Sequence, residues 1–154
     1  MIQRIQSVYL FIAGLASCMA LFAPMAALWT KGFGEPILSF RAFGYESSIP
    51  EMAGRYPHGV IIFLCLTAFI AFFAIFVFKN RKKQLSLVYT GIVCNLLACA
   101  SIVAYMLSIA NKFELEVGVE IYSALPLISL LSFFMACRAI KKDEALVRAA
   151  NRIR

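Results

Sequence analysis

Residues 60–84 read VIIFLCLTAFIAFFAIFVFKNRKKQ, and this stretch decides the fold class of the chain. Its first part, 60–78, contains no Asp, Glu, Lys, Arg or His. A hydrocarbon core about 30 Å thick needs roughly 20 helical residues, so this run is long enough to cross a bilayer. Its second part, 79–84, holds four cations in six positions. The stretch therefore predicts a membrane-spanning helix that ends in a short basic turn.

Three more runs lack the same five residue types, and we expect them to span as well. The chain has 154 residues, 62% of them hydrophobic and 15% charged, and its mean hydropathy is +0.84. These values lie outside the range of soluble domains. The runs do not alternate polar and apolar residues, as barrel strands would. We predict an all-α integral membrane protein, a single four-helix domain over 1–154 with spans at 8–29, 60–78, 85–110 and 121–137.

A cleaved signal peptide is the alternative interpretation of the first run, because Arg4 precedes it. The run has 22 residues, whereas a signal core has about 7 to 15. Its small residues are periodic rather than gathered at a cleavage point. We expect this helix to be retained.

The cations are unevenly divided between the two sides that four spans define. One side carries the termini, the loop 79–84 and the tail 138–154, and it holds 11 of the 15 basic residues. The other side, formed by the outer loops 30–59 and 111–120, holds Lys31, Arg41, Arg55 and Lys112. An excess of Lys and Arg marks the cytoplasmic side, so we expect both termini in the cytoplasm. Contact with RNA or acidic lipid is the alternative function of the basic turn.

The two outer loops contain strand patterns. Residues 37–45 and 112–120 alternate apolar with polar or small residues, and Gly and Pro surround the first of them. A lone strand leaves its backbone unpaired, so we expect these segments to meet in a small antiparallel β cap on the outer side. This layout resembles that of claudin-type four-helix proteins. The claudin cysteine pair and tryptophan motif are absent, so no junction-forming role follows.

Small residues predict how the helices pack. Those of helix one are spaced three and four apart, at Ala13, Ala16, Ala20, Ala23 and Ala27. Helix three has a matching series in Gly91, Cys94, Ala98 and Ser101, and we expect the two series to face each other in a left-handed bundle. Asn95 is the strongly polar side chain deep in a span. We expect it to hydrogen-bond another helix, with a substrate contact as the alternative.

Two further surfaces are candidates for contacts. The phenylalanines of helix two spread around its circumference, which favours lipid contact over a partner helix. The tail 138–154 predicts an amphipathic basic helix that lies on the bilayer or docks onto a protein. The candidate head-group or partner contacts are Arg138, Lys141, Arg148 and Arg152 in the tail and Lys79, Arg81, Lys82 and Lys83 in the turn.

Patterns that carry catalysis or metal binding are missing from the sequence. The cysteines Cys18, Cys65, Cys94, Cys99 and Cys137 lie in or at the end of the spans, without the spacing of a zinc or redox site. His58 has no second imidazole to share a metal. No phosphate loop, nucleophile elbow or ionisable group at midspan is present. We therefore expect no enzyme, catalytic residue, metal or other cofactor, and nucleic acid is not an expected partner.

Both ends of the chain resemble a known family. The opening MIQRIQSVYL (1–10), the LPL of 125–127 and the closing RAIKKDEALVR (138–148) and NRIR (151–154) resemble the domain-of-unknown-function family four-two-nine-three. The resemblance covers the whole chain and implies a small four-span protein of the Gram-negative inner membrane. It implies no activity or site residue.

The sequence favours a non-enzymatic scaffold or accessory subunit of a larger membrane complex. Its partners would be anionic lipid head groups of the bilayer and another membrane protein. The alternative is a membrane protein that binds or transports a small molecule or lipid in a cavity near Asn95.

Overall fold

The computed structural model describes residues 3–29, 36–47, 56–78 and 80–152, with side chains over 5–29, 36–47, 56–78 and 80–147. The long helices of this part are α1 (Gln3–Phe22), α2 (His58–Phe76), α3 (Arg81–Phe113) and α4 (Ala124–Arg152). The strands are β1 (Ala26–Trp29), β2 (Leu38–Arg41), β3 (Gly44–Ser47) and β4 (Glu116–Val119), and a 3₁₀ turn, η2 (Ile121–Ser123), precedes α4. All four of these described helices are long and apolar enough to cross a membrane. The predicted set of long apolar helices with a small antiparallel sheet is confirmed.

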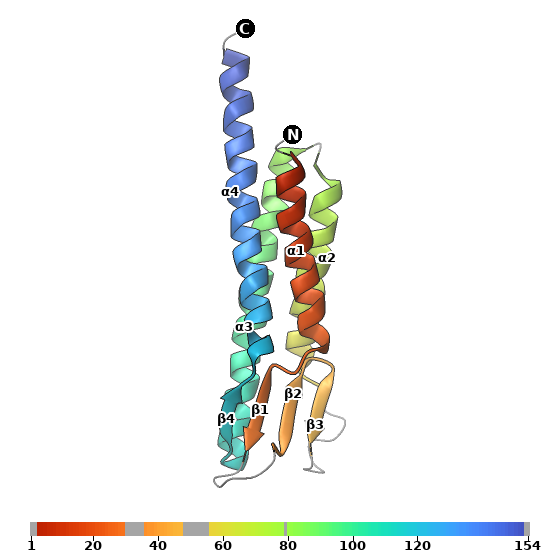
Figure 1. Cartoon of the computed structure of the whole chain (residues 1–154), viewed down its shortest axis with the longest axis vertical. Helices are drawn as coiled ribbons and strands as arrows, with labels where there is room; N and C mark the ends of the chain where they lie inside the picture. Colours follow the sequence, from red (N-terminus) through yellow and green to blue (C-terminus); the bar gives the residue numbers. More distant parts are fainter. Residues whose placement is uncertain (1–2, 30–35, 48–55, 79, 153–154) are drawn as a thin grey trace.

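The helices form a bundle with two distinct ends. Helix α1 packs along α2 and α4, and α3 packs along the same two neighbours, so α1 and α3 lie diagonally across the bundle. The prediction that the small-residue faces of helices one and three pair is therefore wrong. The start of α1, the α2–α3 turn and the far part of α4 lie at one end, which we call the basic end (Figure 1). The sheet lies at the other, the sheet end, and α4 extends well past the start of α1 (Figure 1).

Helix α1 is displaced from the predicted span. We expected a helix over 8–29, but α1 covers Gln3–Phe22 and residues 26–29 form strand β1. Pro24 explains the early end, because proline lacks an amide hydrogen and disfavours helical geometry at the residue before it. Ala23 thus follows the helix and Ala27 lies in a strand, so neither belongs to a helical packing face.

The sheet has the order β3-β2-β1-β4 and is antiparallel throughout the described strands. Strand β4 pairs with β1 in the register Ala26↔Val119, and not with the 37–45 segment as we expected. That segment is not one strand either, because the chain turns after Arg41 and pairs back as β3. Gly44 follows the turn with a φ of 130°, a conformation that favours glycine. The four residues of β1, which the apolar pattern assigned to a membrane-spanning helix, therefore belong to the sheet.

Helix α3 connects the bundle to the sheet. Its 33 residues give a length of about 50 Å, so its last turns extend beyond the bilayer-sized part of the bundle. There the buried residues of α3 join those of the strands in one apolar cluster, the sheet-end core, which includes Leu28, Leu38, Phe40, Ile102 and Met106. The helix ends where Glu114 adopts a left-handed conformation, with a φ of 50°.

The other connections differ slightly from the prediction. The loop 79–84 is shorter than expected, because α3 already begins at Arg81, where the Asn80 side chain accepts a hydrogen bond from the Lys83 amide at 3.3 Å. Pro126 lies in the first turn of α4, where its missing amide hydrogen costs nothing. From there α4 continues without a break through the predicted tail helix as far as Arg152.

Candidate functional site: the polar layer and the basic end

A layer of buried polar side chains crosses the middle of the bundle. Each of the four described helices contributes one fully buried residue to it: Ser17, Thr67, Asn95 and Ser129. Along α1, α2 and α3 these residues separate the sheet-end core from a second apolar cluster, the basic-end core. The basic-end core is made of Leu10, Ala13, Ala71, Ala74, Val88, Ile92, Phe133, Ala136, Cys137 and Ile140.

The layer is held together by hydrogen bonds between helices. The Asn95 amide nitrogen donates to the Ser129 hydroxyl at 3.0 Å, which is an interhelical bond of the kind expected for this residue. The Ser129 and Ser17 hydroxyl oxygens lie 2.8 Å apart, and each lies 3.0 Å from the Ala13 carbonyl oxygen. Through these contacts the layer joins α1, α3 and α4. Thr67 donates within its own helix, to the Phe63 carbonyl at 2.7 Å.

The two serine hydroxyls carry fewer hydrogens than the number of close contacts that they make. Three close contacts link Ser17, Ser129 and the Ala13 carbonyl, but two hydroxyls supply only two hydrogens. At any moment, therefore, only two of these three contacts can be hydrogen bonds. Among the described side chains, the Cys99 thiol is the donor to the carbonyl oxygen of Asn95, at 3.7 Å. The contacts of the layer thus link its polar side chains mainly to one another and to the helix backbone, which fixes the helices relative to each other.

The Asn95–Ser129 bond has a measurable energy that we expect to be modest. In a double-mutant cycle of Asn95→Ala, Ser129→Ala and both, the coupling energy should be about 1 kcal/mol, because hydrogen bonds between membrane helices average about 0.6 and reach about 1.7 kcal/mol. Unfolding of the purified protein in detergent measures it. Ser108→Ala is the control, since its exposed hydroxyl bonds only its own helix and should not couple to Asn95. A coupling energy of zero would contradict the interhelical bond.

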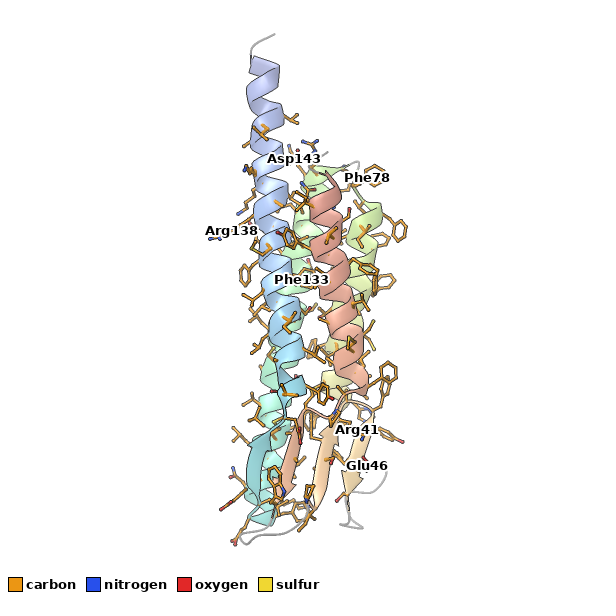
Figure 2. The ribbon with its side chains drawn as sticks, in the orientation of Figure 1. Arg41, Glu46, Phe78, Phe133, Arg138 and Asp143 are labelled. Carbon is orange, nitrogen blue, oxygen red and sulfur yellow. The ribbon has the colours of Figure 1, made fainter. Side chains whose placement is uncertain are left out.

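The small residues of the bundle make room for one large ring. Phe133 of α4 is fully buried, and Figure 2 shows it on the side of α4 toward the other helices. A Cβ placed on Gly91 would lie 2.6 Å from the Phe133 ring, closer than side chains normally approach. Ala13 is buried in the same basic-end core, whereas Ala16, Ala20 and Ala98 are buried elsewhere in the bundle. Gly91 therefore accommodates the Phe133 ring of α4, rather than bringing α1 and α3 together.

A largely buried ion pair fixes α4 to the start of α3. Arg81 Nη2 lies 3.2 Å from Asp143 Oδ2, and Arg81 Nη1 donates to the Asp143 carbonyl oxygen at 3.2 Å. The side chains are 26% and 11% exposed. Oδ2 accepts no aligned hydrogen bond from the described residues, so the attraction to it is ionic. Sequence reasoning missed Asp143 because it follows two lysines in a segment that looks like a solvated tail.

Two amide side chains reinforce the basic end. Gln6 Nε2 donates to the Ala139 carbonyl oxygen at 3.3 Å and so joins α1 to α4. Gln84 Nε2 donates to the Ala74 carbonyl oxygen at 3.0 Å and joins α3 to α2. Both side chains are buried. The Gln6 bond places residue 139 of α4 level with the first turn of α1, so α4 beyond Asp143 lies outside the bundle.

The predicted basic contacts fall into separate places. Arg138 lines a groove of about 360 Å³ between α1 and α4, with Lys142 one turn further on. Lys82 lines a groove of about 510 Å³ along α3, where Lys141 of α4 lies 5.4 Å from the centre of the Tyr89 ring. Arg81 is engaged with Asp143, and Lys83 is exposed in the first turn of α3. Lys79 lies outside the described residues, as do the side chains of Arg148 and Arg152.

The remaining candidate residues are not grouped into a site in the described part of the chain. The cysteines Cys18, Cys65, Cys94, Cys99 and Cys137 are all free thiols. His58 begins α2 and is exposed, with its ring 6.3 Å from that of Tyr56. No group of three His, Cys, Asp or Glu side chains that could hold a metal occurs among the described residues. Four phenylalanines of the α2 region are exposed: Phe69, Phe73, Phe76 and Phe78.

The architecture and the layer together define a class of protein. A bundle of long apolar helices, registered by a buried polar layer and capped by an antiparallel sheet, is typical of a helical membrane protein. The family model "domain of unknown function (DUF4293)" matches residues 2–153, and the chain belongs to this family. No curated protein matches the chain.

Proposed function

We propose that the protein is a non-enzymatic scaffold or accessory subunit of a membrane complex in the bacterial inner membrane. The observation that carries this proposal is the free part of α4. Leu146 and Val147 lie beyond the Arg81–Asp143 pair and are 50% and 41% exposed. Helix α4 continues in line with its bundle part and does not turn across the end of the bundle (Figure 1). Because this part of α4 points away from the bundle, its apolar side chains are better placed to contact a protein partner than the bilayer surface.

The proposed topology places the basic end in the cytoplasm. Among the residues of this end whose side chains are described, there are six cations and two acids, Asp143 and Glu144; the cations are Arg81, Lys82, Lys83, Arg138, Lys141 and Lys142. The described sheet end carries Arg41 and Lys112 against four glutamates. Retention of Lys and Arg on the cytoplasmic side supports this orientation, with both termini inside.

The contacts of Asn95 favour the scaffold over a ligand-binding or transport protein. A ligand beside Asn95 would need its amide, but that amide is fully buried and donates to Ser129. Transport of ions or protons usually requires ionisable groups at midspan, and the described parts of the spans have none there. These features favour a role of the bundle interior in helix packing over a role in ligand binding or transport.

Removal of the free part of α4 tests the scaffold proposal. A chain that stops after Ala145 keeps the Arg81–Asp143 pair and loses the exposed apolar residues. We expect a photo-crosslinker at position 146 of the intact chain to join one membrane protein in native membranes, and that protein to co-purify with the intact chain but not with the shortened one.

The point variant Leu146→Gln/Val147→Gln should behave like the shortened chain, because it removes the apolar contact alone. The matched control Leu146→Ile/Val147→Ile keeps the apolar surface and should retain the partner. Equal recovery of the partner with all four chains, or a chain that is solitary throughout, would contradict the proposal.

A further inference from the structure

Two surface grooves, one between α1 and α4 and one along α3, are lined by similar types of residue. The α1–α4 groove is lined by Ile5, Tyr9, Met135, Arg138, Ala139 and Lys142. The α3 groove is lined by Lys82, Leu85, Ser86, Tyr89, Thr90 and Val93, and Lys141 lies over its tyrosine. Each groove thus combines cations, a tyrosine and an aliphatic floor. We propose that each is a binding site for the head group and upper acyl chain of an anionic glycerophospholipid.

The first argument is the arrangement within the α1–α4 groove. Arg138 and Lys142 are four residues apart on α4, so they lie on the same helix face one turn apart. Arginine offers a planar fork that matches a phosphate, and lysine adds a point charge. Ile5 and Met135 form the apolar wall of the same groove. A phosphate with an attached acyl chain fits such a groove better than a free ion does.

The second argument is the unbalanced charge at the start of α3. Lys82 and Lys83 lie in the first helical turn, which has no acidic residue. The amide hydrogens exposed at a helix start already carry partial positive charge, so cations there are unfavourable and an anion is favourable. Asp143 approaches this turn but is paired with Arg81. Lys82 and Lys141 thus leave a positive charge at the α3 groove.

The third argument is the depth of the α1–α4 groove in the proposed membrane. The apolar part of α1, Ile5–Phe22, is about 27 Å long and so matches the hydrocarbon core. Ile5 and Tyr9 belong to its first turns, so the groove lies at the boundary between acyl chains and head groups. Tyrosines are enriched at this depth, and basic pockets between helices there bind anionic head groups.

The inference rests on the proposed membrane placement but not on the proposed protein partner. Its test therefore uses the purified full-length chain alone, in a neutral detergent, with phosphatidylglycerol, phosphatidylcholine or inorganic phosphate as the probe. Native mass spectrometry counts the lipids that stay bound. We expect two phosphatidylglycerol molecules to be retained in preference to phosphatidylcholine, and inorganic phosphate to leave this retention unchanged.

Variants assign the two sites separately. Arg138→Gln/Lys142→Gln should lose one lipid and Lys82→Gln/Lys141→Gln the other, with affinity about fivefold lower for each cation removed. The charge-preserving variant Arg138→Lys/Lys142→Arg should keep both lipids, which separates charge from folding. Lys83→Gln is the matched control, because it removes a cation from the same turn of α3 but lines neither groove.

Three results would overturn the proposal. Equal binding of phosphatidylcholine would show that charge is not recognised. An equal loss for Lys83→Gln would show that the end as a whole attracts lipid, without defined sites. Displacement of the lipid by inorganic phosphate would show that the grooves bind the free anion.

Discussion

Replacing Gly91 with alanine is expected to lower the free energy of unfolding by about 2 kcal/mol, within the 1–3 kcal/mol that overpacking typically costs. A Cβ at this position would lie 2.6 and 2.8 Å from two atoms of the Phe133 ring and 3.3 Å from Ile70 Cγ2. The ring has no solvent-exposed surface and is enclosed by the basic-end core, so it cannot move aside cheaply. Thermal unfolding in detergent, followed by circular dichroism, should show a Tm lower by about 4–8 °C.

The choice of Gly91 has a matched control and a rescue. Gly59→Ala places a Cβ 3.6 Å from its nearest neighbours, an ordinary contact, and alanine favours the helix, so stability should be unchanged or slightly higher. Phe133→Leu shortens the obstructing side chain. The double variant Gly91→Ala/Phe133→Leu should therefore lose less stability than the sum of the two single changes. Strict additivity would show that the ring is not what excludes a side chain at Gly91.

Asp143→Asn is expected to cost about 2 kcal/mol and to loosen α4 from the start of α3. Removing one partner of a buried pair leaves the other charge unpaired, which costs about 3–5 kcal/mol when both are fully buried. Arg81 is 26% exposed and recovers part of its hydration, so the smaller value applies. Unfolding in detergent measures the loss, and hydrogen exchange should show faster exchange in the turns of α4 around Asp143.

An exposed ion pair at the sheet end provides the control for Asp143. Arg41 Nη2 lies 2.9 Å from Glu46 Oε2, closer than the atoms of the Arg81–Asp143 pair, but its side chains are 44% and 68% exposed. Figure 2 shows Arg41 and Glu46 at the sheet end and Asp143 toward the opposite end of the molecule. Glu46→Gln should cost no more than about 0.5 kcal/mol, because surface pairs are screened by water. A similar loss for both variants would mean that burial does not govern the Arg81–Asp143 pair.

Apolar sequence runs predicted the helices well because their signal is local. A run without ionisable residues, such as 60–78, has few alternatives once it is about 19 residues long. The basic turn after it correctly separated α2 from α3, and the unbroken pattern of the tail correctly predicted a helix. Asn95 was recognisable for the same reason, as an amide surrounded by apolar residues.

The first run shows where that local signal fails. Residues 26–29 are apolar in a membrane helix and equally apolar in a buried strand, so hydropathy cannot tell the two apart. The observed strand depends on β2 and β4, its partners on either side. Pro24 was visible in the sequence, but proline alone does not distinguish a kinked helix from a terminated one.

Composition and the distribution of charge thus determined by themselves that the chain has four long apolar helices and one strongly basic end. Tertiary structure alone decided that Phe133 fills the space beside Gly91, that Asp143 pairs with Arg81, and that the polar side chains form one layer. These contacts join residues far apart in sequence, such as Ser17 and Ser129. Their partners are set by how the helices pack, whereas a residue's own hydropathy is set by its immediate neighbours in the chain.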